Sequence, residues 1–290
     1  MGRSLPWDDR GCHPGPSRQP PLAVAADTSP GRPAATRLGT LRRVRLREDQ
    51  LQDFYEDCYT PGVDGDKYRR WRELGARGKA DHVVDLVTRA GLAAPASVAE
   101  VGCGDGAVLA ELARRGFGTT HVGYEISASG VRLAAERPEI DAAHVFDGTR
   151  LPVDDQAYDL AFATHVLEHV PEPEPLVAEL LRVCRMLVIE VPLEASLSAQ
   201  RPAARAASEG VGHLHHFDRR RMRAMVTAAG GRVRGELADP LPRAVHLFGA
   251  DTPAARAKGY AKWAVRAGLA ALPGVGERLF TLHYALVATR

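Results

Sequence analysis

The chain has 290 residues, 45% of them hydrophobic and 26% charged, and a formal net charge of +2. This composition is typical of a globular protein with one large domain or two small ones, and the small net charge gives no reason to expect nucleic acid as a partner. The four cysteines form no C-x-x-C pair, which argues against a zinc motif or a disulfide framework, and no apolar run reaches the length of a membrane span. We therefore expect a cytoplasmic protein without a membrane span and without a resident metal.

The first 45 residues are rich in proline, glycine, arginine and serine and show no hydrophobic periodicity. Such a segment cannot bury enough apolar surface to offset its ordering entropy, so residues 1–45 are predicted to form a disordered tail. Residues 1–50 hold nine arginines against five acids. A solvated tail is the main interpretation, and contact with nucleic acid or a membrane is the alternative.

The next segment, residues 46–80, is aromatic and charged and is predicted to form an N-terminal helical lid. Tyr68, Trp71 and Arg72 fall on one helical face. Two interpretations stay open: a lid over a ligand, or a helix that packs its aromatic side chains on the domain. Residues 81–290 then form the predicted main domain, which begins with an amphipathic helix.

Strands and helices alternate from residue 97 onward. This alternation predicts an α/β fold with a mostly parallel sheet that is covered on both faces and binds ligands beyond the carboxyl ends of its strands. The predicted strands are Ser97–Val101, Thr120–Glu125, Ala142–Phe146, Tyr158–Thr164 and Met186–Val191. The predicted helices between them are Ala107–Arg115, Ser127–Glu136 and Pro173–Cys184.

The pattern changes after Pro192. Residues 193–212 are polar and aperiodic, which predicts a long functional or mobile loop. Beyond it, Asp218 is predicted to cap a helix that ends near Ala229. The remaining predicted elements are a strand at Arg232–Leu237, an inserted helix at Thr252–Leu272 and an antiparallel edge strand at Leu279–Ala288.

A glycine-rich turn, V-A-E-V-G-C-G-D-G, occupies Val98 to Gly106 between the first predicted strand and its helix. Glycines permit a sharp turn and a close approach to a ligand, and a helix start offers N–H groups to an acceptor. Gly102, Gly104 and Ala107 also fit the dinucleotide fingerprint G-x-G-x-x-G/A. A glycine turn without any ligand is the third possibility.

Two acids further along the chain lie where a nucleotide would need them. Glu125 ends the second predicted strand, where one carboxylate can accept both ribose hydroxyls. This placement fits NAD equally well. Asp147, in Phe146-Asp147-Gly148 at the end of the third strand, can accept a hydrogen bond from an exocyclic adenine amine.

Six motifs in order complete the pattern: E-V-G-C-G-D-G, Y-E-I-S, F-D-G, L-P-V-D-D-Q-A-Y-D, H-V-L-E-H-V and G-H-L-H-H-F-D. With them the chain resembles class I S-adenosylmethionine-dependent methyltransferases of the type 11 / type 23 group. The resemblance implies a Rossmann-like, seven-stranded, mostly parallel sheet with an antiparallel last strand and helices on both faces. It also implies S-adenosyl-L-methionine as the cofactor.

The same resemblance implies a role for each matching residue. Glu100 with Gly102, Cys103, Gly104 and Gly106 would hold the methionine end of the cofactor. Glu125 would bind the ribose. The adenine would lie against Ile126, Asp147 and Gly148, and the sulfonium side would be lined by Thr164 and His165. His169 is interpreted as a structural histidine at a helix start.

Methyl transfer is an in-line displacement with an activated leaving group, so alignment carries much of the rate. A base is needed only for an acceptor that is protonated at the working pH. The candidate bases are the histidines of G-H-L-H-H-F, namely His213, His215 and His216, with Glu190 and Glu194 as weaker candidates. The alternative is that these histidines cap or pack. A metal site is not expected there, because no fourth ligand is evident.

The predicted acceptor is a small molecule of natural-product or sugar type, methylated on oxygen or nitrogen. Insertions at about 193–216 and 252–278 are expected to build its pocket. Two other functions stay open: a NAD-dependent oxidoreductase on a Rossmann sheet, which leaves F-D-G and H-V-L-E-H-V unexplained, and a non-catalytic cofactor-binding protein. The acceptor itself and the oligomeric state are not predicted.

Overall fold

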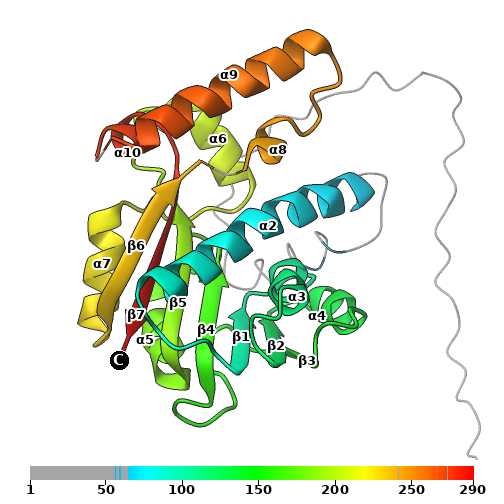
Figure 1. Ribbon diagram of the computed structural model, residues 1–290, viewed down its shortest axis with the longest axis vertical. Coiled ribbons are helices and arrows are strands. Elements are labelled where there is room, and N and C mark those ends of the chain that lie inside the picture. Colours follow the sequence, from blue (N-terminus) through cyan, green and yellow to red (C-terminus); the bar gives the residue numbers. More distant parts are fainter. Residues whose placement is uncertain (1–55, 57–58, 60–64, 241, 273) are drawn as a thin grey trace, which may run out of the picture. The chain divides into compact units, whose positions relative to one another are not determined.

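Seven strands form a single sheet in the order β3-β2-β1-β4-β5-β7-β6 (Figure 1). The computed structural model describes residues 56, 59, 65–240, 242–272 and 274–290. The predicted tail and most of residues 46–64 therefore lie outside the described residues. The strands are β1 Ser97–Val101, β2 Thr120–Glu125, β3 Ala142–Val145, β4 Tyr158–Thr164, β5 Cys184–Pro192, β6 Arg232–Asp239 and β7 His283–Thr289.

Every pair of neighbouring strands from β3 to β5 is parallel, whereas β7 is antiparallel to both β5 and β6. The predicted mostly parallel sheet with an antiparallel last strand is thus confirmed. Strand β1 lies between β2 and β4, so the chain reverses direction across the sheet at this point. A crevice opens beyond the carboxyl ends of the strands at such a switch point, and it is where ligands of open α/β sheets bind.

Helices cover both faces of the sheet (Figure 1). Side chains of α2, α3 and α4 join one hydrophobic cluster, and those of α5 and α7 join another. The strands alternate between the clusters with a period of two: Met186 and Val188 of β5 belong to the first, and Leu187 and Ile189 to the second. These helices are α2 Gly65–Arg89, α3 Ala107–Arg114, α4 Ala128–Ala135, α5 Pro173–Val183 and α7 Arg219–Ala228.

Helix α2 runs without a break through the predicted boundary between residues 80 and 81. The reason is a continuous buried stripe, Ala76, Ala80, Val83 and Val87, at helical spacing. Gly78, in the middle of the helix, packs against Pro242. A Cβ at this position would come 2.5 Å from the proline Cδ, which leaves room only for glycine. The expected lid and the amphipathic helix after it are therefore parts of one element.

The region after Pro192 holds more helix than predicted. Residues 193–212, expected to be a loop, contain α6 Pro202–Gly210, in which Ser208 is the one buried residue and no apolar period reveals the helix. The inserted helix is confirmed as α9 Pro253–Ala270, with the Thr252 hydroxyl accepting from the Ala255 amide at 3.1 Å. Two short helices were not predicted, α8 Arg243–His246 and α10 Val275–Leu279. The second replaces the expected start of β7.

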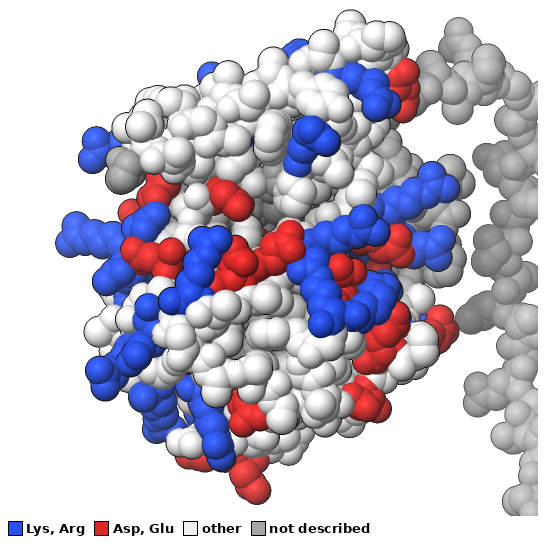
Figure 2. All heavy atoms as spheres, viewed as in Figure 1, with Lys and Arg blue, Asp and Glu red and all other residues white. Residues whose placement is uncertain are grey.

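No helix among the described residues is both long and apolar enough to cross a membrane. On the face drawn in Figure 2, Lys and Arg side chains are interspersed with Asp and Glu side chains. The described residues on this face do not form the continuous basic stripe that binding to a phosphate backbone uses.

Phe162 in β4 is fully buried between the sheet and α2, so its loss leaves a large cavity. We expect Phe162→Ala to lower the free energy of unfolding by about 3–5 kcal/mol. Val145→Ala, at an exposed position of β3, is the control and should stay within about 0.5 kcal/mol. Urea denaturation measures both, and equal effects would contradict this description of the core.

Candidate functional site

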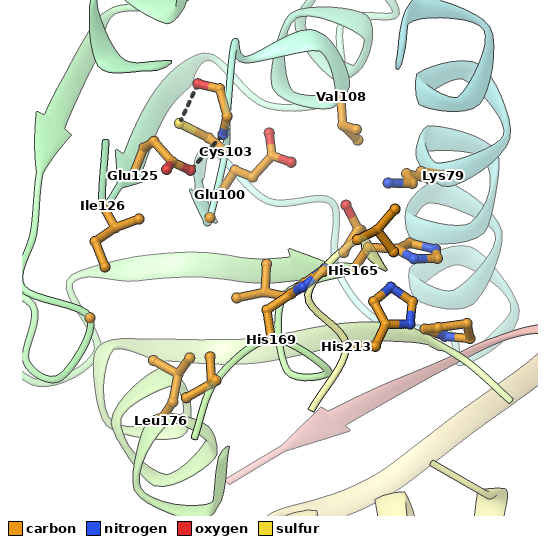
Figure 3. A pocket seen from close by; sticks show the side chains of 18 of the residues that line it. Lys79, Glu100, Cys103, Val108, Glu125, Ile126, His165, His169, Leu176 and His213 are labelled. Atoms are coloured by element: carbon orange, nitrogen blue, oxygen red, sulfur yellow. Dashed lines mark hydrogen bonds between the residues drawn. The ribbon is translucent and has the colours of Figure 1, made fainter. Parts of the chain in front are cut away.

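A cavity of about 910 Å³ opens beyond the carboxyl ends of β1, β4 and β5. Its walls come from α2, the glycine turn, the ends of the strands, and the segment from Pro192 to His213. Figure 3 shows Glu125 and Ile126 toward one end, and Lys79, His165 and His213 toward the other. Ten of the eleven residues predicted to bind the cofactor line this one cavity, and Gly106, at the end of the glycine turn, does not.

The glycine turn is tight for reasons internal to the protein. Gly102, Gly104 and Gly106 have φ angles of 74°, 55° and 73°, a region that other residues rarely adopt. A Cβ at these positions would collide with Val166, Tyr59 and Ile140 respectively. The sequence interpretation, that glycines admit a ligand, is therefore incomplete, because protein side chains already fill the space beside them.

Glu100 is buried at the end of β1 and caps the next helix. Its Oε2 accepts from the Leu109 amide of α3 at 3.0 Å. Burial raises the pKa of this carboxyl well above its usual value. Glu100 thus supports the turn and also faces the cavity, which is compatible with the role that the resemblance implies for it.

Glu125 binds the glycine turn directly. One oxygen accepts from the Gly104 amide at 2.9 Å, and the other accepts from the amide and hydroxyl of Ser127 at 3.1 and 3.0 Å. Burial raises the pKa of the carboxyl, although these hydrogen bonds oppose the shift. The carboxylate is therefore held at the cavity wall in a fixed orientation, and the oxygen bound to Gly104 keeps a lone pair for a further hydrogen bond.

Asp147 is exposed and shapes its own loop. Its Oδ1 accepts from the Thr149 amide and hydroxyl at 2.8 and 2.7 Å and from the Arg150 amide at 3.0 Å. These bonds lower the pKa of Asp147. The loop places Gly148, with a φ of 82°, beside Ile126, whose Cδ1 would be 3.8 Å from a Cβ there.

His165 follows β4 in a left-handed backbone conformation, with a φ of 60°. Its Nε2 lies 3.2 Å from Glu190 Oε1 and 2.7 Å from His283 Nδ1, while its Nδ1 lies 3.0 Å from Glu168 Oε1. Thr164, just before it, is buried on the cavity wall. Sequence analysis placed His165 correctly in the cavity but gave it no partners.

Two histidines of this network were missed: His283, a partner of His165, and His82, a partner of Glu190. His283 begins β7, and because β7 is antiparallel, its start lies at the carboxyl ends of the parallel strands. His82 lies on the buried side of α2, where its Nδ1 contacts Glu190 Oε2 at 2.8 Å and its Nε2 contacts Asp239 Oδ1 at 3.0 Å. Burial opposes protonation of His82, but these two acids raise its pKa to about 10.

Glu168 is fully buried. Burial would raise its pKa, but the contact with His165 and the nearby His169 and His213 lower it to about 2. Neither carboxylate oxygen has a well-aligned hydrogen bond among the described residues. The backbone carbonyl of Glu168 accepts from the Leu214 amide at 2.7 Å, which brings the G-H-L-H-H-F segment to the cavity.

The three candidate bases are separated by the fold. His213 lines the cavity, and its Nδ1 lies 2.8 Å from Glu194 Oε2 and 3.0 Å from the Ser208 hydroxyl. His215 instead directs its Nε2 at the backbone carbonyls of Val170 and Pro171, at 2.9 and 3.1 Å, and does not line the cavity. His216 does not line the cavity either.

Helix α2 contributes cavity residues that motif analysis did not assign. Lys79 lines the wall near Glu100 and His165, and Trp71 lines the same cavity. The Arg72 guanidinium contacts Asp105 at 3.1 Å and stacks over the Tyr59 ring at 4.9 Å. Tyr68, the third member of the predicted face, has no described side chain, and the movement expected of a lid stays a prediction.

Comparison with known proteins identifies a family. A model of a methyltransferase domain matches residues 68–234, more than half of the chain. The chain is 29% identical over 130 residues to a ubiquinone biosynthesis O-methyltransferase of Serratia proteamaculans (strain 568). The matched region is 41% of this chain and 52% of that protein, so the chain spans about half the length of this curated relative.

Solved structures share the fold. A Thermotoga maritima S-adenosylmethionine-dependent methyltransferase, a possible histamine N-methyltransferase, has a TM-score of 0.53 at 14% identity, covering 82% of this chain and 99% of that one. A Synechocystis magnesium protoporphyrin IX methyltransferase with bound S-adenosylhomocysteine has a TM-score of 0.53 at 16% identity, and the match covers 84% of this chain and 100% of that one. A Haemonchus contortus phosphoethanolamine N-methyltransferase has a TM-score of 0.55 at 11% identity, and the match covers 83% of this chain and 60% of that one.

The pKa of His82 predicts how stability depends on pH. Its folded value of about 10 exceeds the ordinary 6.5, so its contribution is complete below about pH 6.5 and is lost as the pH rises toward 10. Between about pH 6.5 and 9.5, we expect the unfolding free energy of His82→Gln to decrease by roughly 2 kcal/mol less than that of the wild type. Urea denaturation at several pH values measures this slope. His144→Gln, on exposed β3, should keep the wild-type slope, and an unchanged slope in His82→Gln would contradict the assignment.

Proposed function

We propose that this chain, which belongs to the methyltransferase-domain family and is a class I S-adenosylmethionine-dependent methyltransferase, transfers the methyl group to oxygen or nitrogen of a small molecule. The observation that carries the proposal is the His213–Glu194 pair on the wall of the same cavity that holds the cofactor-motif residues. A cavity of about 910 Å³ is within the size range of small-molecule sites. The NAD-dependent alternative shares the glycines and Glu125 but is not the family that the chain matches.

The cofactor would lie along the glycine turn. Glu125 would accept from the ribose hydroxyls, with Asp147 and Ile126 at the adenine and Glu100 near the methionine end. Support for this arrangement comes from Glu100, Glu125 and Ile126, which lie on one side of the cavity (Figure 3), and from Asp147, which lines the same cavity. Thr164 and His165 follow β4 and would then face the sulfonium, where the methyl group leaves.

The reaction needs alignment and a place for one proton. The acceptor lone pair forms a bond to the methyl carbon, the carbon–sulfur bond breaks, and its electron pair stays on the neutral sulfur. The acceptor proton would go to His213. Since Nδ1 of His213 is within 2.8 Å of Glu194 Oε2, that nitrogen carries the hydrogen and Nε2 holds the lone pair.

The acceptor class follows from the other walls. Segment 193–213 and the residues around Thr281 close the cavity end opposite Ile126. This end is built of histidines, small alcohols and Lys79, a surface suited to a polar, hydroxyl- or amine-bearing compound of natural-product or sugar type. The names of the similar proteins include both O- and N-methyltransferases, so they support either atom.

Glu125→Gln tests the cofactor site. The substitution removes the charge, and its amide NH₂ faces a backbone or hydroxyl donor, so S-adenosylhomocysteine should bind about 10–100-fold more weakly in calorimetry. Glu179→Gln, on α5 and paired with Arg182, is the matched control and should bind normally. Unchanged affinity in a folded Glu125→Gln would show that the ribose lies elsewhere. Tight NADH binding without a signal for S-adenosylhomocysteine would contradict the cofactor itself.

His213→Gln tests the base. An acceptor is first found by incubating the protein with labelled S-adenosylmethionine and small-molecule fractions of cell extract. With that acceptor, we expect His213→Gln to lower kcat by about 10²–10⁴-fold and to leave the affinity for S-adenosylhomocysteine unchanged. His216→Gln, outside the cavity, should retain activity within about threefold. Equal losses in the two variants would exclude His213 as the base.

A further inference from the structure

Three side-chain atoms converge on one point at the edge of the cavity. His165 Nε2 lies 2.7 Å from His283 Nδ1 and 3.2 Å from Glu190 Oε1, and the last two atoms are 3.5 Å apart. They come from the ends of β4, β5 and β7, which are neighbours in the sheet. Both histidines line the cavity, whereas Glu190 is buried beneath them.

Two of the three spacings, 3.2 and 3.5 Å, match those of ligands around a metal ion, and the two imidazole nitrogens lie closer together, at 2.7 Å. Bonds of about 2.0–2.1 Å in tetrahedral geometry place ligand atoms about 3.3 Å apart. Two imidazole nitrogens and one carboxylate oxygen form the donor set of His₂Glu zinc enzymes and of the facial triad that binds iron. Hydrogen bonds alone serve this arrangement poorly, because His165 Nε2 faces two partners and carries at most one hydrogen.

Each ligand is oriented from behind by a further group. The Nδ1 of His165 lies 3.0 Å from Glu168 Oε1, so this nitrogen carries the hydrogen and Nε2 is left with a lone pair. The second oxygen of Glu190 contacts His82 Nδ1 at 2.8 Å. The left-handed backbone of His165 is a costly conformation for a residue with a side chain, and it is what turns the ring toward Glu190 and His283.

The charges around the point are also those of a cation site. Glu168 and Glu190 are both fully buried, and Glu168 lacks a well-aligned hydrogen bond among the described residues. Lys79 and His82 supply positive charge nearby, but neither aligns with the oxygens of Glu168.

We propose that His165, Glu190 and His283 bind one divalent first-row transition-metal ion, whose remaining coordination positions face the cavity and take an acceptor oxygen or nitrogen. Binding of the ion does not depend on the proposed function, whereas the role of the ion in methyl transfer rests on that function. Coordinated to the ion, an acceptor hydroxyl loses its proton more easily. The proton passes to His213, the oxygen bonds to the methyl carbon, and the electron pair of the broken carbon–sulfur bond stays on sulfur.

A second group of potential ligands, Glu168, His169 and His213, supplies the matched control. Its donor atoms lie within 4.8 Å of one another, and His213 Nδ1 already contacts Glu194. An ion at this group would depend on His213. An ion at the proposed site would not, so substitutions of His213 and His283 separate the two positions.

The experiment is a metal titration of the full chain after dialysis against a chelator. Co²⁺ reports binding through its visible absorption, and competition with Zn²⁺ and elemental analysis give the stoichiometry. We expect one ion per chain, and an affinity at least about 100-fold lower in His283→Gln and Glu190→Gln, since loss of an outer partner alone costs 10–100-fold. His213→Gln should bind within about threefold of wild type. Circular dichroism and S-adenosylhomocysteine binding verify that each variant is folded.

Three results would overturn the proposal: no saturable binding by the wild-type chain, unchanged binding by His283→Gln, or loss of the ion in His213→Gln alone. Should a substitution unfold the chain, electron spin-echo spectroscopy of Cu²⁺-loaded wild-type protein decides, because it counts coordinated imidazoles and two are expected. A chain that binds the ion but transfers no methyl group would contradict the proposed function and leave the metal site standing. Full transferase activity of the chelator-treated chain would overturn the role of the ion and leave the proposed function standing.

Discussion

The carboxylate of Glu190 is the interaction on which the cavity depends. A fully buried charge is costly unless it is paired, and this one is paired only through the fold: His82 comes from α2, His165 from the end of β4 and His283 from the start of β7. Those partners are 108, 25 and 93 residues away along the chain. Removing one of them leaves the buried charge with two partners instead of three in the wall of the site. The same set of contacts therefore fixes the helix, the sheet edge and the shape of the cavity.

The two ends of the cavity are built by different means. At the end with Glu125, backbone amides and glycines do most of the work, because Gly104 and Leu109 donate to Glu125 and Glu100. At the other end, side chains that carry protons face one another, and hardly any backbone group takes part. A rigid frame suits a ligand that never changes, whereas exchangeable side chains suit a partner that differs from one methyltransferase to another.

Most of the fold could be predicted because it is encoded locally. Alternating strand and helix periods located all seven strands to within a few residues, and the glycine turn with Glu125 and Asp147 indicated one wall of the cavity. The unity of α2 was missed, since Gly75 and Gly78 suggest a break and the Pro242 contact that explains Gly78 comes from 164 residues further along. Helix α6 was missed because only Ser208 is buried. His82 and His283 were missed because a histidine in a strand or helix has no meaning until its partner is known, and no sequence spacing relates them to Glu190.

Helix α2 has a mechanical consequence. Its 25 residues form a rod about 37 Å long, with Trp71 and Lys79 facing the cavity and His82 tied to Glu190 only one turn further on. The part of α2 that lines the cavity and the part tied to Glu190 belong to one continuous helix, so a displacement of the first would also shift the partner of the buried carboxylate.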